Sequence, residues 1–205
     1  MRSPKRFNHR KLIFEGNSLT DLGQDGGPVY GQYVPLTIYN NVKASHTLVY
    51  SCYAISGRTQ TQINASLSTN ITPYIRPGDI IINWEGTNDL FVNALSANDA
   101  YANLVTYANT VRNLGAKLII GTVIARDYVS DPGDLMDRID AYNVLVRTNA
   151  SSICEAVCDL GADAMFDTRA DTANGTNYKA DKVHLATAGQ NNVISLMTTT
   201  LNTIL

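Results

Sequence analysis

The chain has 205 residues, of which 44% are hydrophobic and 17% charged, and its mean hydropathy is −0.10. These values predict a soluble globular protein and exclude a disordered or fibrous chain. No apolar stretch approaches the roughly 18 residues that a membrane-spanning helix needs, so we expect no membrane span.

The first eleven residues differ from the rest of the chain in charge. They hold five of the sixteen basic residues, Arg2, Lys5, Arg6, Arg10 and Lys11. The net charge of the whole chain is −2, so the remainder, with 11 basic and 18 acidic residues, stands at about −7. An acidic body argues against nucleic acid as the main partner. We predict a basic arm at residues 1–10, either a solvated leader or a link to an upstream domain or an anionic surface, and a single folded domain at residues 11–205.

The arm does not have the pattern of a secretory signal peptide. Only Leu12, Ile13 and Phe14 follow its charges, where an apolar region of at least about 7 residues is required. The chain as given is therefore predicted to be cytoplasmic, or secreted if an export signal has been removed.

Beyond the arm, short apolar runs alternate with helical patterns. Strands are predicted at residues 11–14, 47–53, 79–84, 117–124 and, more weakly, 164–167, and helices at residues 61–75, 96–114, 134–160 and 187–205. Ser96 is expected to cap the second helix and Gly115 to end it. The runs at residues 79–84 and 117–124 are almost continuously apolar, as in strands buried on both faces. The pattern predicts a doubly wound α/β sandwich, with its binding site beyond the carboxyl ends of the strands.

The three cysteines are predicted to be buried free thiols. Cys154 and Cys158 lie four residues apart in a helical pattern, so they are expected to share a helix face, and Cys52 is distant from both. No histidine or second cysteine pair completes a zinc site.

One strand end presents a candidate nucleophile. In residues 12–23, LIFEGNSLTDLG, the apolar run stops at Glu15 and is followed by Gly16, Asn17 and Ser18. Gly, Asn and Ser are ordinary turn residues. A serine at the end of a rigid strand also suits nucleophilic catalysis, provided that a neighbouring histidine takes its proton.

Of the three histidines, only His184 has an acidic partner at close range. His9 lies in the polar arm and His46 just ahead of a strand, whereas Asp181 stands three residues before His184. In a turn, this spacing lets the carboxylate orient the imidazole and leaves the other ring nitrogen facing a serine. The spacing alone is weak evidence, because many surface turns contain such a pair.

Two further segments at strand ends carry groups that suit an oxyanion hole. Asn88, in NWEGTNDL, offers a side-chain NH2 donor, although turn chemistry explains Gly, Asn and Asp there equally well. Gly57, in AISGRTQTQI, offers a backbone N–H with no side chain in the way.

Together these segments resemble the SGNH (GDSL-type) hydrolase family. The four blocks, in the family's order and spread across residues 11–205, are Gly16-Asn17-Ser18-Leu19, Gly57, Gly86-Thr87-Asn88-Asp89 and Asp181-Lys182-Val183-His184. The resemblance implies a flavodoxin-like, three-layer α/β/α sandwich around a central, mostly parallel five-stranded sheet. It also implies that no metal or organic cofactor is needed.

The resemblance further implies a role for each matching residue. Ser18 corresponds to the nucleophile, His184 to the general base and acid, and Asp181 to the carboxylate that orients the histidine. The oxyanion hole would consist of the backbone N–H groups of Ser18 and Gly57 with the side chain of Asn88.

Position 17 departs from the family. The commoner block reads Gly-Asp-Ser, with an aspartate that helps to hold the nucleophile turn and is not the acid of the triad, whereas this chain has Asn17. Asparagine retains much of the same hydrogen bonding and removes a negative charge beside the forming oxyanion.

The resemblance predicts a serine hydrolase that cleaves carboxylic esters through an acyl-enzyme intermediate, either a short-chain esterase or a carbohydrate O-deacetylase acting on a small-molecule or carbohydrate ester. The alternatives are a lysophospholipase or thioesterase, and a non-catalytic carbohydrate-binding module on the same fold. A Rossmann-type nucleotide binder fits less well, since no G-x-G-x-x-G follows the first strand.

Overall fold

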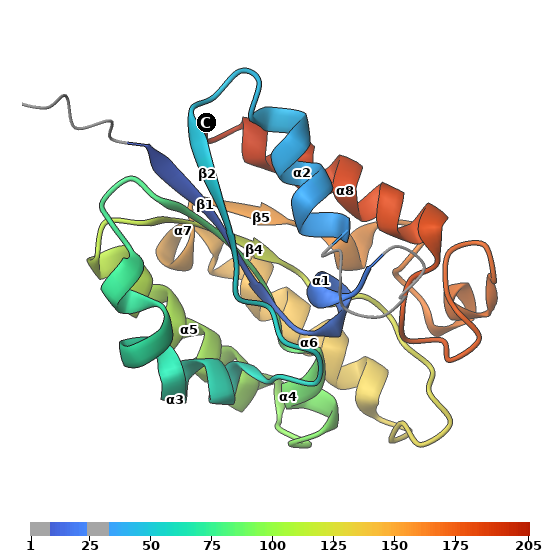
Figure 1. The fold of residues 1–205 in the computed structure, drawn as a ribbon. Helices are drawn as coiled ribbons and strands as arrows, with labels where there is room; N and C mark the ends of the chain where they lie inside the picture. The colour runs from blue at the N-terminus through green and yellow to red at the C-terminus, as the bar shows by residue number, and fades with distance from the viewer. Residues whose placement is uncertain (1–8, 24–32) are drawn as a thin grey trace, which may run out of the picture.

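The computed structural model of the chain describes residues 9–23 and 33–205. Its strands form one parallel sheet in the order β2-β1-β3-β4-β5 (Figure 1). The bounds are β1 (Arg10–Gly16), β2 (Leu48–Cys52), β3 (Ile80–Trp84), β4 (Lys117–Gly121) and β5 (Ala156–Cys158). The predicted parallel sheet at the centre of an α/β fold is confirmed.

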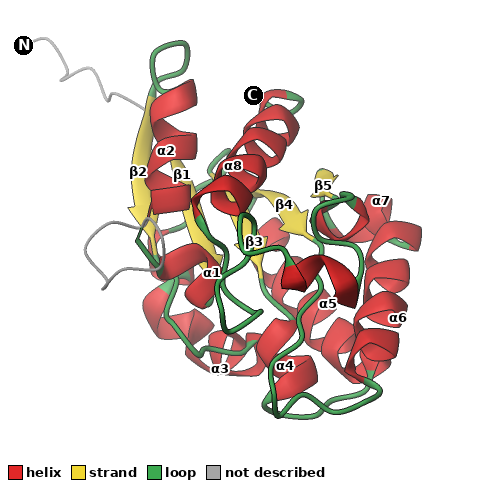
Figure 2. Ribbon diagram, turned by 90° about the vertical axis from the view of Figure 1, so that its right-hand side faces the viewer, coloured by secondary structure: helices red, strands yellow, loops and turns green. Residues whose placement is uncertain are grey.

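Helices cover both faces of this sheet. On one face α2 (Tyr33–Val42) packs beside α8 (Thr187–Asn202), and on the other lie α3 (Gln60–Asn70), α5 (Ala97–Asn113) and α6 (Leu135–Thr148) (Figure 1). The connections contain the short helices α1 (Ser18–Asp21), α4 (Thr87–Phe91) and α7 (Ala150–Ile153) (Figure 2). They also contain the 3₁₀ turns η2 (Thr72–Tyr74), η3 (Leu160–Ala162) and η4 (Arg169–Ala173). The three-layer α/β/α sandwich is therefore confirmed.

The central strands are apolar throughout because their alternate side chains enter two different cores. Ile13 and Ile81 pack under α3, α5 and α6, whereas Leu12, Phe14 and Ile82 pack under α2 and α8. A strand with apolar neighbours on both faces has no position for a solvated side chain. This explains the continuous apolar runs in the sequence.

The connections around β1 place the site. From β1 the chain passes through α2 on one face to β2, and from β2 through α3 on the other face to β3, which pairs with β1 on the side opposite β2. The chain therefore reverses its winding direction between β1 and β3. In open α/β sheets, ligands bind outside the carboxyl ends of the strands at such a switch point.

Trp84 closes β3 and fills the space beneath the switch point. It is 2% exposed, and its indole N–H donates to the carbonyl of Thr122 at 3.1 Å. A Cβ on Gly121 would approach the indole to 2.8 Å, so the neighbouring strand needs glycine at this position. The last residue of β3 is thereby fixed just before the Glu85–Gly86 turn.

The prediction was wrong at the fifth strand and the third helix. The helix predicted at 134–160 ends as α6 at Thr148, continues as the short α7, and gives way to β5 at Ala156–Cys158. Residues 164–167 form turns, so the strand predicted there is absent. A three-residue strand next to helices carries too short a pattern to be distinguished from a helix end.

The cysteines are free thiols, as predicted, but Cys154 and Cys158 do not share a helix face. Cys154 follows α7 and Cys158 ends β5, and both are buried, whereas Cys52 is partly exposed. The helix α2 was not predicted; Pro35 lies in its first turn, where proline is tolerated.

The predicted basic arm lies largely outside the described residues, and Arg10, its last residue, begins β1. Among the helices at residues 9–23 and 33–205, none is both long enough and apolar enough to cross a membrane.

Candidate active site

Ser18 stands two residues after the end of β1, at the first position of α1. Gly16 closes the strand, and a Cβ there would collide with the side chain of Thr20. Asn17 caps α1, because its side-chain oxygen accepts a hydrogen bond from the N–H of Leu19 at 3.0 Å. The glycine and the cap together force a sharp turn that presents Ser18 at the carboxyl edge of the sheet.

His184 and Asp181 reach Ser18 from the other end of the chain. His184 Nε2 lies 2.8 Å from Ser18 Oγ, and His184 Nδ1 lies 2.8 Å from Asp181 Oδ2. Partial burial alone would raise the pKa of Asp181, but hydrogen bonds from the His184 ring and from the N–H groups of His184 and Val183 hold that pKa below its usual value. The carboxylate therefore stays ionised and fixes the orientation of the imidazole.

The turn that carries Asp181 and His184 is held by the segment after β4. Lys182, between them, has a φ of +56°, an unfavourable left-handed conformation for a residue with a side chain. Asp127 holds it there twice, since its N–H donates to the Lys182 carbonyl at 3.0 Å and its carboxylate pairs with the Lys182 ammonium at 2.8 Å. Tyr178, at the base of the same turn, donates from its hydroxyl to the Ala125 carbonyl at 3.0 Å.

Gly57 and Asn88 line the same cavity as Ser18 and His184. Within the described parts of the chain, the backbone N–H groups of Ser18 and Gly57 have no hydrogen-bond partner. The Asn88 side chain donates one N–H to the carbonyl of Arg58 at 2.8 Å, which leaves its second N–H for another acceptor. The structure thus brings together all five residues that the sequence singled out.

Two buried aspartates, to which the sequence assigned no role, join the loops of the site. Asp21 on α1 accepts hydrogen bonds from the N–H and the hydroxyl of Ser56 at 3.0 and 2.9 Å, which holds the Gly57 loop against the Ser18 helix. Asp89 on α4 accepts from the backbone N–H groups of Gln60 and Thr61 at 2.5 and 3.2 Å. It thereby anchors the start of α3 beside Asn88. Their partners are distant in sequence, so spacing carries no signal for either contact.

Two glutamates lie beneath the site in the layer between the sheet and α3, α5 and α6. Burial raises the pKa of Glu15 to about 8, although Arg58, whose guanidinium is 3.6 Å away, opposes the shift. Burial likewise raises the pKa of Glu85 well above its usual value, against a hydrogen bond from Asn17. The sequence did contain a signal for the burial of Glu15 and Glu85, since one acid lies within an apolar strand and the other directly follows one.

The cavity at the site has a volume of about 520 Å³ and opens to solvent. Its apolar wall includes Leu22, Phe91 and Tyr128. Arg126 lies with its guanidinium 4.1 Å from the centre of the Phe91 ring and forms a two-point ion pair with Asp131 at 3.0 and 2.8 Å. This pair closes the segment after β4 into a compact loop beside the cavity.

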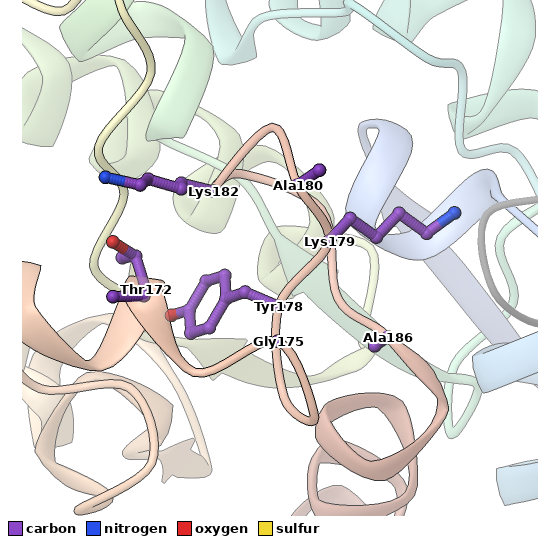
Figure 3. Close-up of a pocket in the computed structure, with 8 residues that line it drawn as sticks. Thr172, Gly175, Tyr178, Lys179, Ala180, Lys182 and Ala186 are labelled. Carbon is purple, nitrogen blue, oxygen red and sulfur yellow. The ribbon is translucent and has the colours of Figure 1, made fainter.

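A second hollow, of about 620 Å³, lies on the outer side of the Asp181–His184 turn and contains none of Ser18, Gly57, Asn88 or His184. Tyr178 and Thr172 line it, and the side chains of Lys179 and Lys182 extend away from each other on opposite sides (Figure 3). The two ammonium groups do not converge on a common point, so this hollow is not a built anion site.

Comparison with known proteins agrees with this geometry. Residues 14–191 match the model of the GDSL-like lipase/acylhydrolase family. The chain belongs to this family. A search of curated protein sequences gave no significant match. Membership in the GDSL-like lipase/acylhydrolase family establishes the general activity, hydrolysis of an acyl or ester bond.

Solved structures resemble this GDSL-like acylhydrolase at low sequence identity. The crystal structure of TesA has a TM-score of 0.73 and 20% identity over 96% of this chain and 100% of that chain. The lipase/acylhydrolase from Enterococcus faecalis has a TM-score of 0.70 and 14% identity, covering 93% and 94%. Axe2, an acetylxylan esterase from Geobacillus stearothermophilus, has a TM-score of 0.67 and 20% identity, covering 95% and 94%. At identities of 14–20%, this structural similarity establishes the fold and not the substrate.

For metal ions, residues 9–23 and 33–205 contain no cluster of three or more His, Cys, Asp or Glu side chains that could hold one.

Proposed function

We propose that this acylhydrolase is a serine esterase that removes short acyl groups, in particular acetyl groups from carbohydrate hydroxyls. The observation that carries the proposal is the chain of two 2.8 Å contacts from Asp181 through His184 to Ser18. A neutral imidazole whose Nδ1–H is held by an ionised carboxylate presents its Nε2 lone pair to the serine hydroxyl.

The reaction proceeds in two halves. His184 takes the proton of Ser18 while Oγ attacks the ester carbonyl, and the resulting oxyanion is stabilised by the N–H groups of Ser18, Gly57 and Asn88. His184 then gives the proton to the leaving alcohol, which departs and leaves an acyl-Ser18. Water, deprotonated by His184, attacks the acyl group, and collapse of the second tetrahedral intermediate releases the carboxylic acid and restores Ser18.

Two features of the cavity support a small acyl group and a sugar leaving group. The Arg126–Asp131 pair ties the two ends of the segment after β4 together, which limits how far this segment can extend over a bound acyl chain. Tyr128 is 42% exposed beside the cavity and offers an aromatic face against which a sugar ring can stack. Axe2, described as an acetylxylan esterase, shares the fold.

A panel of p-nitrophenyl esters of graded chain length, together with acetylated sugars, tests the proposal. We expect the acetyl ester to be hydrolysed faster than longer esters, acetate to be released from the sugars, and Ser18→Ala to abolish both activities. Ser68→Ala, on the exposed side of α3, is the matched control and should retain full activity. Faster turnover of long-chain esters would instead assign a lysophospholipase or thioesterase. Absence of any hydrolysis would favour a binding module.

A further inference from the structure

Asn17 uses both ends of its side chain. Its Oδ1 accepts from the N–H of Leu19 at 3.0 Å, and its Nδ2 donates to Glu85 Oε2 at 2.9 Å. The reverse orientation of the amide would set its NH2 group against the Leu19 N–H. The hydrogen bonds therefore require Oδ1 to face Leu19 and Nδ2 to face Glu85. Asn17 is 2% exposed, so its side chain is shielded from bulk solvent.

Glu85 is an unusual partner, because it is itself 2% exposed and a buried carboxyl group is costly to keep. Its second oxygen, Oε1, has no hydrogen-bond partner among the described residues. The titratable and charged groups that interact with it come from every neighbouring element, namely Glu15 (β1), Arg58 (ahead of α3), Asp89 (α4), Tyr107 (α5) and Tyr142 (α6). Within residues 9–23 and 33–205, the hydrogen bond from Asn17 is the only one that the side chain of this acid makes.

We propose that Glu85 is a positioning residue for the nucleophile: it holds the side chain of Asn17, which in turn caps the turn that presents Ser18. The inference rests on the proposed function of Ser18. It also explains why position 17 carries an amide. An amide donates to the carboxyl group of Glu85 at every pH, whereas an aspartate contacts it only through a proton that the two carboxyl groups share.

An aspartate at position 17 would set two carboxyl oxygens about 2.9 Å apart, the distance that now separates Asn17 Nδ2 from Glu85 Oε2. Two carboxyl groups this close cannot both ionise, so they share one proton. Once the pH is high enough to remove that proton, repulsion separates the groups and displaces the Ser18 turn.

The test compares wild type, Asn17→Asp, Glu85→Gln and the double variant between about pH 6 and about pH 8.5. Two assays are used. Steady-state hydrolysis of p-nitrophenyl acetate gives kcat and KM, and covalent labelling of Ser18 by a fluorophosphonate gives a rate that reports the reactivity of the serine whatever the natural ester. For Asn17→Asp we expect a loss of about tenfold or more in kcat and labelling relative to wild type, growing with pH, and little change in KM.

The second substitution should reverse the loss. In the double variant the amide introduced at position 85 donates to the carboxylate introduced at position 17, so both rates should return to within about threefold of wild type with the wild-type pH profile. Glu85→Gln alone retains an acceptor for Asn17 and should also stay within about threefold. An Asn17→Asp enzyme that follows wild type at every pH, or a double variant no better than Asn17→Asp, would overturn the proposal.

If Asn17→Asp does not fold, Glu85→Leu carries the test. Removal of the acceptor should lower kcat and labelling about tenfold, whereas Glu85→Gln does not, and wild-type rates in Glu85→Leu would refute the positioning role. A wild-type protein that neither labels nor hydrolyses the ester would remove the proposed function and this inference with it. Normal wild-type labelling with equal labelling of Asn17→Asp removes the inference alone.

Discussion

Asn88 connects two of the loops that surround Ser18. One amide N–H is occupied by the Arg58 carbonyl, and the side chain lines the cavity. Such a donor is pre-oriented, because the bond to Arg58 prevents the amide from rotating. A pre-oriented donor stabilises a developing oxyanion more than it stabilises a ground-state carbonyl, so its contribution should be to kcat.

We predict that Asn88→Ala lowers kcat by about 10²- to 10³-fold while KM changes little. Steady-state kinetics with p-nitrophenyl acetate measure both parameters. Asn98→Ala, at an exposed position on α5, is the control and should behave as wild type. A loss of only a few-fold in a folded Asn88→Ala protein would leave Asn88 as a turn residue.

The sequence predicts the residues of the site better than it predicts their supports. Ser18, Asn88 and His184 follow strands or precede a helix in recognisable blocks, and the structure gathers them. Glu85 and its partner Asn17 are 68 residues apart, and nothing in the local pattern of either residue specifies the other. Contacts of this kind arise from the register of β1 against β3, which places Glu15 opposite Asn83 and the following turns side by side.

At the scale of elements, Asp89 ties α4 to the first turn of α3. It is fully buried and accepts three hydrogen bonds from the helix start, from the N–H of Gln60 and from the N–H and hydroxyl of Thr61. The donors at a helix start have no partner within the helix itself, and an acidic side chain there satisfies them. The same contact fixes α3 relative to the Gly57 loop.

We predict that Asp89→Ala lowers the free energy of unfolding by about 2–3 kcal/mol, because the buried N–H of Gln60 and the N–H of Thr61 lose their acceptor. Denaturant unfolding measures the change. The matched control is Asp99→Ala in the exposed first turn of α5, for which we expect a loss of no more than about 1 kcal/mol. Equal losses in the two variants would contradict a special role for Asp89.

The strands and helices differ in how well the local sequence predicts them. The first four strands were predicted within a few residues, and the two central strands β1 and β3 are apolar runs with a core on both sides. The fifth strand, Ala156–Cys158, has three residues and depends on its pairing with β4, which no local pattern reveals. The helix α2 was missed because its stability comes from packing against α8 and the sheet.

At the scale of the whole molecule, the buried acids make stability depend on pH. The pKa of Glu15 is raised by burial from its usual 4.5 to about 8, so between these values the folded state holds a proton that the unfolded state has released. The contribution of Glu15 to stability is therefore greatest below about pH 4.5 and falls as the pH rises to about 8. Glu85 acts in the same direction.

We predict that Glu15→Gln weakens this dependence. The difference in Tm between about pH 5 and about pH 8 should shrink by several degrees, because glutamine stays neutral at both values. Scanning calorimetry at the two pH values measures the difference. Asp137→Asn, on the exposed side of α6, is the control and should keep the wild-type dependence. An unchanged difference in Glu15→Gln would show that the carboxyl group is not the source.

The position of Trp84 gives the molecule a built-in optical probe. It is the one tryptophan of the sequence, it is buried against Gly121, and it directly precedes Glu85. Its emission in the native state should be that of an indole shielded from water, and it should move to longer wavelength when the core opens. Intrinsic fluorescence can therefore follow the packing beneath the nucleophile turn in every variant described above, without a label.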